Sequence, residues 1–376
     1  MARIDLVFPA ADVPFNGIGD HTARLAAALS DRGHHVRILT RATTSGHGYP
    51  SPHIDAWGDR PLRRLTGVVE AVREAPPDLL VLQFEQFAYG AYGFNPELLT
   101  LMRRLRRAAP TAQLLLFAHE TYVSRGSWSH TLMWAYQRRQ LRALARGADG
   151  VLANCALGMR RIGAFTDHVT LVPVPSNLPQ STATRAAARE ALGLDAAALY
   201  AAVFGHLDPG RLAYLEAALA NASADAPIRL LYVGKDESTA RALAARAEVP
   251  AVVLAQAAPD DAALALRAAD VGFCPFGDGA SGKRGSLAAC LDHRLPTVTN
   301  GGPDTDRFLH EAATAGALTL TASEVCAYAV AARDLCVSAP TRAAMTRALE
   351  APGLTLASWE ATADAVEAHL SSEVHA

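Results

Sequence analysis

Short apolar runs alternate with helix-like segments along this chain, and this alternation constrains its fold more than any other feature. In the first half, the apolar runs occupy residues 4–8, 35–40, 79–84, 113–119 and 150–155. Between the first two runs, residues 21–33 repeat apolar side chains with a period near 3.6 and stop at Gly33, as a helix does. Strands that alternate with helices form parallel sheets covered by helices. We therefore expect a doubly wound, Rossmann-like α/β domain over residues 1–174.

The alternation stops once and then resumes. Residues 172–185, VPVPSNLPQSTATR, are rich in Pro, Ser and Thr, so we expect an interdomain linker there. Further apolar runs occupy residues 200–205, 229–234, 250–256, 271–276 and 295–300. They predict a second parallel α/β domain over residues 186–356. Residues 358–370 then predict an amphipathic helix that opens on a serine cap and a first-turn carboxylate, and its packing partner stays open.

Composition excludes several function classes. Half of the 376 residues are apolar, enough for two cores, and the net charge of −2 argues against general nucleic-acid binding. The five cysteines form no CxxC pair, which favours free thiols in a reducing compartment. The chain opens without the basic and apolar regions of a signal peptide, and no window approaches eighteen apolar residues. We expect a cytoplasmic protein.

Ligands of parallel α/β sheets bind outside the carboxyl ends of the strands, so the loops there are the candidate sites. Gly17 and Gly19 lie between the first strand and the first helix, where glycine permits close approach and a helix start favours anions. The spacing is G-x-G-x-x-T, and the second strand lacks the acidic residue that holds a ribose, which disfavours a nicotinamide cofactor. An anion site and an ordinary tight turn both fit these glycines.

The segment FGDGASGKRGS, residues 276–286, precedes a small-residue helix expected near 286–293. Lys283 and Arg284, together with the helix amides, would neutralise a diphosphate. Gly282 and Gly285 allow the backbone to approach it closely. The alternative is a surface loop with two solvated cations.

A second polar loop opens the second domain. His206 and Arg211 follow the run at 200–205, where they would reach a ligand in the cleft expected at the strand ends. The forked donors of arginine suit phosphate oxygens. A solvated side chain at a helix start is the alternative for Arg211.

Polar residues also end two strands of the first domain. His119 and Glu120 follow the run at 113–119, and His119 there suits contact with a sugar hydroxyl or proton transfer, or else a structural role. Glu85 and Gln86 follow the run at 79–84. We take Glu85, Gln86, Glu120 and Tyr122 as candidate acceptor residues, although the aromatic side chains near them suit packing equally.

Taken in order, these segments resemble the retaining, nucleotide-sugar-dependent glycosyltransferases of the GT-B fold, a family that includes sucrose synthases and bacterial mannosyltransferases. NGIGDHTARLAAALSDRGHHVRILT looks like the family's G-G-I-G…L-A-x-x-L-x-x-x-G-H-x-V stretch. FGHLDPGRL is similar to its G-R-L-x-x-x-K-G loop, and LRAADVGFCPF…LPTVTNGG to its A-D-V…P…G-x-P-V-V stretch. The resemblance covers nearly the whole chain. It implies two facing Rossmann-like domains and a last helix that crosses back to the first domain.

The resemblance also implies roles for the candidate residues. His119 matches the histidine that contacts the donor sugar, and it is our candidate catalytic residue. Candidate contacts of the donor diphosphate are Gly17, Gly19, His206, Arg211, Lys283, Arg284, Gly285 and Ser286. In such enzymes these groups replace a cation, so the resemblance implies no metal and no cofactor besides the nucleotide sugar. It also implies transfer with retention and without an obvious protein nucleophile.

One motif departs from the family pattern. The usual Glu-x7-Glu pair is replaced by Ser281 and Ala289, which leaves recognition of the ribose and of the sugar open. A subgroup carries G-A-S-x-x-R-G-S-L, and GASGKRGSL resembles it. We assign Ser281 and Gly282 to the donor sugar.

The sequence therefore predicts a glycosyltransferase that moves a hexosyl group from a nucleoside diphosphate sugar to a hydroxyl-bearing acceptor. The acceptor is either a small molecule of antibiotic type or an envelope glycan. A non-catalytic nucleotide-sugar-binding relative and a GT-B sugar-nucleotide epimerase stay open as alternatives. Four arginines in LMRRLRRAAP, residues 101–110, suit either a peripheral membrane contact or a solvated helix face.

Overall fold

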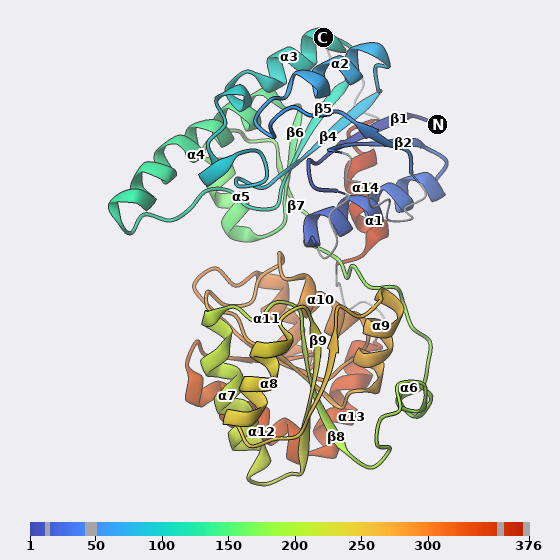
Figure 1. Ribbon diagram of the computed structural model, residues 1–376, viewed down its shortest axis with the longest axis vertical. Helices are drawn as coiled ribbons and strands as arrows, with labels where there is room; N and C mark the ends of the chain where they lie inside the picture. The colour runs from blue at the N-terminus through green and yellow to red at the C-terminus, as the bar shows by residue number, and fades with distance from the viewer. Residues whose placement is uncertain (12–15, 42–50, 352–356, 371–376) are drawn as a thin grey trace. The chain divides into compact units, whose positions relative to one another are not determined.

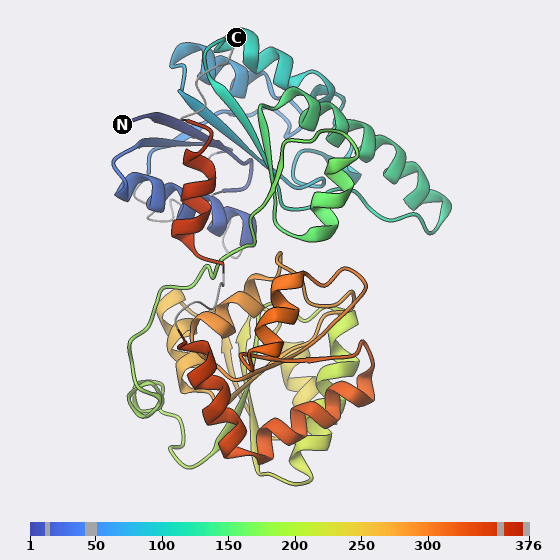
Figure 2. The same cartoon turned by 180° about the vertical axis from the view of Figure 1, so that it is seen from behind.

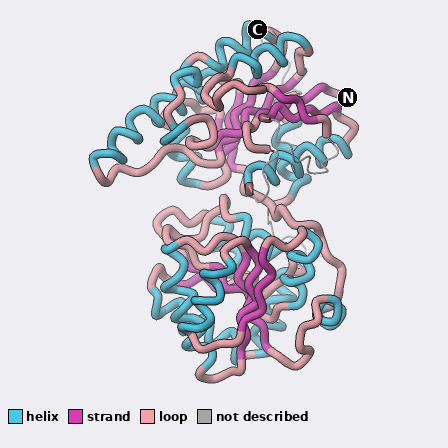
Figure 3. The backbone as a smooth tube through the Cα atoms, in the orientation of Figure 1, coloured by secondary structure: helices cyan, strands magenta, loops and turns pink. Residues whose placement is uncertain are grey.

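The computed structural model describes residues 1–11, 16–41, 51–351 and 357–370. The chain divides into two compact units, shown in Figures 1 and 2. Unit 1 comprises Met1–Pro173 with Ser358–Ala376, and unit 2 comprises Val174–Ala357. Each unit contains one parallel sheet with helices packed against it, visible as the magenta strands and cyan helices of Figure 3. The predicted fold class, two parallel α/β domains, is confirmed.

Unit 1 is built on a seven-stranded sheet in the order β3-β2-β1-β4-β5-β6-β7. The strands are β1 Arg3–Val7, β2 His35–Thr40, β3 His53–Asp55, β4 Leu79–Phe84, β5 Gln113–Ala118, β6 Gly150–Ala153 and β7 Val169–Leu171. The helices are α1 Gly17–Asp31, α2 Thr66–Glu74, η1 Ala91–Gly93, η2 Pro96–Leu99, α3 Leu101–Ala108, α4 Trp128–Gly147 and α5 Ala156–Gly163. In register, Leu6 of β1 pairs with Ile38 on one side and Val81 on the other. The short strands β3 and β7 were not predicted.

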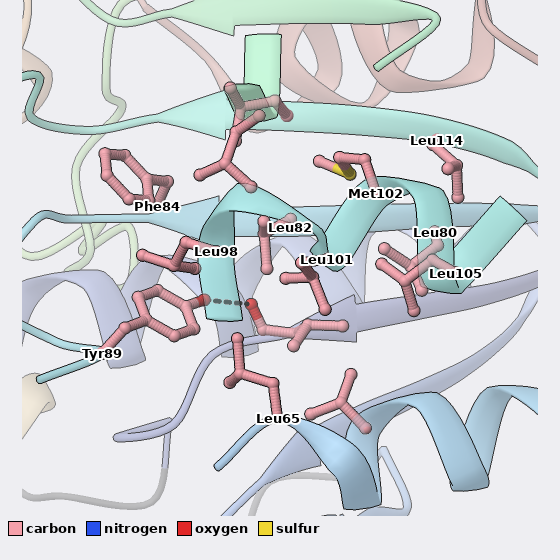
Figure 4. Packing of buried hydrophobic residues seen from close by; sticks show 14 of the residues in the cluster. Leu65, Leu80, Leu82, Phe84, Tyr89, Leu98, Leu101, Met102, Leu105 and Leu114 are labelled. Carbon is pink, nitrogen blue, oxygen red and sulfur yellow. Dashed lines mark hydrogen bonds between the residues drawn. The ribbon is translucent and has the colours of Figure 1, made fainter. Parts of the chain in front are cut away.

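The core of unit 1 lies on both faces of β4, because every residue of that strand is fully buried. Leu80, Leu82 and Phe84 point to one face, where they join the apolar cluster drawn in Figure 4. Leu79 and Val81 point to the opposite face. Alternation along a strand sends successive side chains to opposite faces, so Gln83 shares the face of Leu79 and Val81.

The C-terminal helix α14, Trp359–Glu367, belongs to unit 1 and packs against α1. Ser358 caps it by accepting from the Ala361 amide, as the sequence predicts. Ala363 and Val366 of this helix are fully buried in the core on the α1 face of the sheet. Arg32, the C-cap residue of α1, also donates to Asp364 at 2.6 Å. Apolar burial and ion pairs thus both hold α14 in place.

Val366→Ala is expected to destabilise unit 1 by about 1–3 kcal/mol, because it removes buried methyl groups and leaves a cavity. Asp364→Ala removes an exposed ion pair and is expected to cost at most about 1 kcal/mol. Urea unfolding of the two variants measures both values. An equal loss in both would show that the ion pairs, rather than apolar burial, anchor α14.

Unit 2 has a six-stranded parallel sheet in the order β10-β9-β8-β11-β12-β13. Its strands are β8 Leu199–Phe204, β9 Ile228–Gly234, β10 Ala251–Ala255, β11 Val271–Cys274, β12 Thr297–Asn300 and β13 Thr319–Thr321. Its helices are α6 Arg185–Ala191, α7 Pro209–Ser223, α8 Glu237–Arg246, α9 Pro259–Ala268, α10 Gly285–Asp292, α11 Arg307–Thr314, α12 Val325–Val337 and α13 Ala339–Leu349. The apolar run at 271–276 is a strand only to Cys274, since Pro275 has no amide hydrogen to donate.

Candidate functional site

The two cations of the loop between β11 and α10 share one carboxylate. Lys283 Nζ lies 3.5 Å from Asp278 Oδ2, and the Arg284 guanidinium also contacts Asp278. Arg284 stacks on the Phe276 ring with its Cζ 4.6 Å from the ring centroid. Both cationic side chains are largely buried, whereas the Asp278 side chain is 61% exposed. Positive charge is therefore concentrated beside the start of α10, balanced by a carboxylate on the solvent side.

The start of α10 adds backbone donors to these cations. Arg284 is its N-cap residue, and within the described residues no side chain caps this helix. A Cβ on Gly285 would meet only a Val174 methyl at 3.9 Å, so the first turn is not covered by close packing there. Ser286 lies against Gly205 at the end of β8. First-turn amides and the helix dipole favour an anion at such a position.

Close backbone packing fixes the loop after β11. Gly279 has a φ of +87°, and a Cβ there would lie 2.6 Å from the amide nitrogen of Gly302 after β12. Asn300 accepts from the Phe276 amide at 2.7 Å, and Asp306 accepts from the Gly282 amide at 2.7 Å. Sequence reasoning missed Asn300 and Asp306. The polar residues that follow the run at 295–300 were the available signal.

Arg211 lies beneath this loop. It is only 2% exposed, and its guanidinium donates to the carbonyls of His206 at 2.5 Å and Pro275 at 3.0 Å. It therefore ties the chain after β8 to the chain after β11. The geometry gives Arg211 a structural task alongside the diphosphate contact that the sequence predicts.

His206, in contrast, is exposed over 61% of its side chain. Its Nδ1 lies 2.7 Å from Asp236, a residue after β9 that sequence reasoning missed. Burial by itself would raise the pKa of Asp236, but hydrogen bonds from the Leu207 amide and from His206 outweigh burial and lower that pKa. Asp236 thus stays ionised and holds the His206 ring.

The two positions that replace the family's glutamates are both buried. The Ser281 hydroxyl has no hydrogen-bond partner among the described residues. Ala289 is fully buried in the core beside α10, so its methyl group offers nothing polar. The Gly282 carbonyl accepts from the Val174 amide at 2.7 Å. Of the two positions, only Ser281 thus offers a polar side chain for a ligand.

In unit 1, His119 follows β5 and is held on several sides. Its Nε2 lies 2.5 Å from Gln83 Oε1 of β4. Its ring stacks on Phe117 with the centroids 4.7 Å apart and the planes at 10°. Burial lowers the pKa of His119 to about 3. The imidazole is neutral at physiological pH and is fixed in orientation.

A second histidine packs on the first. The His21 ring of α1 meets His119 edge-on at 4.7 Å and lies 5.0 Å from Trp359 of α14. Within the described part of the chain, both ring nitrogens of His21 are buried without a partner, and burial lowers its pKa well below the usual value. Asn154, after β6, donates to the His119 carbonyl at 2.9 Å. Sequence reasoning missed His21, Gln83 and Asn154, because each stands in or beside an apolar run.

The glycines at the start of α1 differ from each other. A Cβ on Gly17 would meet no described atom within 4 Å. A Cβ on Gly19 would lie 2.9 Å from the Ala10 carbonyl oxygen, so Gly19 is needed for packing. The Gly19 amide already donates to the Asn16 side chain at 3.0 Å.

The candidate acceptor residues lie at two neighbouring strand ends. Burial raises the pKa of Glu85, and the charge of Glu120 adds to this effect. The Glu85 carboxylate accepts from the Phe87 amide at 3.0 Å. Gln86 is buried, and the Tyr122 ring is covered by Arg161 at 4.7 Å. Glu85 and Glu120 are thus close enough to interact, whereas Tyr122 is partly occupied by a cation.

The pKa of His119 predicts acid sensitivity. Because the unfolded chain binds this proton near pH 6.5 and the folded chain only near pH 3, stability is lost as the pH falls through that window. At pH 5 the expected loss is about 2 kcal/mol relative to neutral pH, and His21 adds to it in the same direction. Urea unfolding at pH 7.5 and pH 5 measures the loss. His119→Gln should reduce it, and an unchanged loss in that variant would remove His119 as its source.

Comparison with protein-family models decides which family the first unit resembles. Residues 16–175 match the model described as "Glycosyl transferase 4-like domain". The first half of this chain is similar to a glycosyl transferase 4-like domain. The matched segment includes His119 with His21, Gln83 and Asn154, both helix-start glycines and the candidate acceptor residues. A comparison with curated protein sequences gives no match.

Solved structures extend the likeness to the whole chain. Sucrose-phosphate synthase from Thermosynechococcus elongatus aligns with a TM-score of 0.71 at 16% identity, over 98% of each chain. WaaG, a glycosyltransferase involved in lipopolysaccharide biosynthesis, aligns at 0.67 and 18% identity, over 97% of this chain and 99% of that one. Anabaena HepE in complex with UDP and glucose aligns at 0.65 and 16% identity, over 98% and 97%.

Epimerases share this fold. A putative UDP-N-acetylglucosamine 2-epimerase from Listeria monocytogenes aligns at 0.61 and 13% identity, over 100% of this chain and 98% of that one. At such identities the likeness shows the GT-B fold alone. Together with the domain match, the glycosyltransferase neighbours support the prediction of a glycosyltransferase.

Among the described residues, no group of three or more His, Cys, Asp or Glu side chains is arranged to hold a metal ion. No helix in that part of the chain has the length and apolar character needed to span a membrane.

Proposed function

We propose that this protein is a retaining glycosyltransferase that uses a nucleoside diphosphate sugar as donor. The observation that carries the proposal is the start of α10, where Lys283 and Arg284 stand beside first-turn amides that no described side chain caps. That arrangement suits two linked phosphates better than a single carboxylate, because it offers two cations and several amides. The Anabaena neighbour with UDP and glucose supports a uridine nucleotide as the first donor to test.

The same groups would assist the chemistry. As the bond between the sugar and the diphosphate breaks, negative charge grows on the leaving diphosphate. Cations and amides fixed in advance stabilise that charge more than the ground state, which lowers the barrier. When the donor binds, its phosphate oxygens replace the Asp278 carboxylate as the partners of Lys283 and Arg284. Ser281 and Gly282 lie next along the loop and contact the sugar, and no side chain is assigned as nucleophile.

Unit 1 supplies the polar groups for the hydroxyl chemistry. Neutral His119 accepts a hydrogen bond from a hydroxyl of the donor sugar, and Glu85 with Glu120 binds the acceptor hydroxyl. A small molecule and an envelope glycan both present such hydroxyls. The neighbour involved in lipopolysaccharide biosynthesis supports testing a glycan acceptor.

A membrane-bound acceptor would suit one surface of unit 1. Neither α3 nor α4 contains an acidic residue, and together they carry Arg103, Arg104, Arg106, Arg107, Arg138, Arg139, Arg142 and Arg146. Of these, Arg104 pairs with Glu97 and Arg106 with Asp149, which leaves the charge of the other arginines for a membrane surface. Trp128 at the start of α4 is 83% exposed. Basic side chains with an exposed tryptophan favour an anionic membrane surface. Sedimentation with anionic vesicles, and not with neutral ones, would support this contact. Equal sedimentation with both would oppose it.

A thermal-shift screen of nucleoside diphosphates and their sugar conjugates tests the donor. A ligand that binds only the folded protein raises the melting temperature by mass action. The expected result is a rise with one base and a sugar transfer to a hydroxyl acceptor with that base's conjugate. His119→Ala should then reduce turnover by a larger factor than it reduces the fraction of folded protein. Binding without turnover against any acceptor would instead indicate a non-catalytic nucleotide-sugar-binding protein.

A sugar-nucleotide epimerase is the second candidate, favoured by one observation. Burial, with the charge of Glu120 adding to it, raises the pKa of Glu85, so this carboxyl group keeps its proton to a higher pH than usual and is a candidate for proton transfer. Incubation of the donor without acceptor separates the two functions. An epimerase changes the sugar configuration under these conditions, whereas a transferase leaves the donor largely intact.

A further inference from the structure

Gln83 is the single polar residue of β4, whose other five residues are apolar. All six are fully buried. Its side chain has one hydrogen bond among the described residues, which joins Oε1 to His119 Nε2, and its Nε2 is buried without a partner there. An unpaired buried amide hydrogen costs roughly 1–3 kcal/mol, and leucine would fill the site without that cost. Stability alone therefore does not explain this glutamine.

The geometry around His119 leaves the ring little freedom. Phe117 stacks on one face, and His21 meets the ring at 78°. Asn154 fixes the backbone by donating to the His119 carbonyl. With the ring plane set by packing, the bond to Gln83 selects which nitrogen carries the proton. An amide oxygen accepts, so Nε2 is the donor and Nδ1 keeps its lone pair.

We propose that Gln83 is a positioning residue that holds His119 as the Nε2–H tautomer, so that Nδ1 accepts a hydrogen bond from a hydroxyl of the donor sugar. The step rests on the proposed function, because it assigns a partner to His119 in that reaction. Gln83 itself acts only through the imidazole. His21 is the titratable side chain packed on the ring, and it is buried and neutral as well.

Nitrogen NMR of the imidazole tests the tautomer without reference to activity. The wild-type protein is expected to show His119 protonated at Nε2. In Gln83→Leu the preference should weaken or reverse, while the fold is kept because leucine suits the apolar strand. A wild-type Nδ1–H tautomer, or an unchanged Nε2–H tautomer in Gln83→Leu, would overturn the proposal. Neither result bears on whether the protein transfers sugars.

The pH dependence of kcat in Gln83→Glu provides a further test, because a purely structural role of Gln83 predicts no change in it. At low pH the imidazole beside the new carboxylate takes up a proton, both ring nitrogens become donors, and Nδ1 ceases to be a free acceptor. A carboxyl group that took up the proton instead would still accept from Nε2–H through its carbonyl oxygen, as the glutamine amide does. At high pH the proton is lost and the wild-type arrangement returns. We expect kcat to fall roughly tenfold or more at pH 6 and to recover toward pH 9, a dependence that the wild type lacks.

Gln140 provides the matched control. It is another buried glutamine of unit 1, and among the described residues its side chain bonds only backbone groups, at Asn95 and Gly93. Gln140→Glu should change stability without creating the new pH dependence of kcat. The same pH dependence in both variants would show that any buried carboxylate disturbs the unit, and it would overturn the specific role of Gln83. Absence of transfer in the wild type, with the expected tautomer present, would count against the proposed function alone.

Discussion

Arg284→Ala is expected to weaken binding of the nucleoside diphosphate by about 1–3 kcal/mol, the value of a charge-assisted hydrogen bond. In the dissociation constant this is roughly a 5- to 150-fold increase. The side chain lies beside the start of α10, so its loss removes a phosphate partner and leaves the helix amides in place. Isothermal titration with the diphosphate that scores in the thermal screen measures the change. Unchanged affinity would remove Arg284 from the site.

Two further variants make this test specific. Arg307→Ala removes a cation from the same unit whose side chain is 92% exposed and pairs with Glu311 one turn along the helix, so affinity should not change. Asp278→Asn has the opposite expected sign. It removes the carboxylate that competes for Lys283 and Arg284, so the diphosphate should bind more tightly. Weaker binding in Asp278→Asn would indicate that the carboxylate organises the loop instead of competing with the ligand.

Gly279→Ala is expected to disrupt the donor loop. Its φ of +87° costs a side-chain-bearing residue about 1–2 kcal/mol. The new Cβ would also lie 2.6 Å from the Gly302 amide nitrogen, and relief of this overlap costs about 1–3 kcal/mol more. Because the overlap is with backbone, the loop that carries Lys283 and Arg284 must move. Loss of stability, by urea unfolding, should accompany loss of diphosphate binding.

Gly316→Ala separates the two costs. Gly316 has a similar φ of +75°, but a Cβ there meets nothing within 4 Å. Gly316→Ala should lose only the stability that the positive φ costs, and it should keep full diphosphate affinity. If Gly279→Ala behaved like Gly316→Ala, the contact between the loops after β11 and β12 would not matter for binding.

The sequence correctly predicted the strands and the helix that have long apolar runs or a clear cap. The runs at 35–40 and 79–84 became β2 and β4 with those same bounds, because apolar strands between turn residues have few alternatives. The serine cap and acidic first turn likewise located α14. Strands β3, β7 and β13 were not predicted, since each has three residues, too few for a periodic pattern.

The residues of the candidate site also fall into two groups, those that the sequence predicted and those whose role only the structure revealed. The sequence by itself determined the two α/β domains and marked Lys283, Arg284 and His119, because charged and polar residues directly after apolar strands stand out locally. Only the tertiary structure decided that Arg211 is buried beneath the loop, that Asp278 balances both cations, and that Gln83 meets His119. These are contacts between residues distant in sequence or between adjacent strands. Their energies depend on burial and distance, which no local pattern encodes.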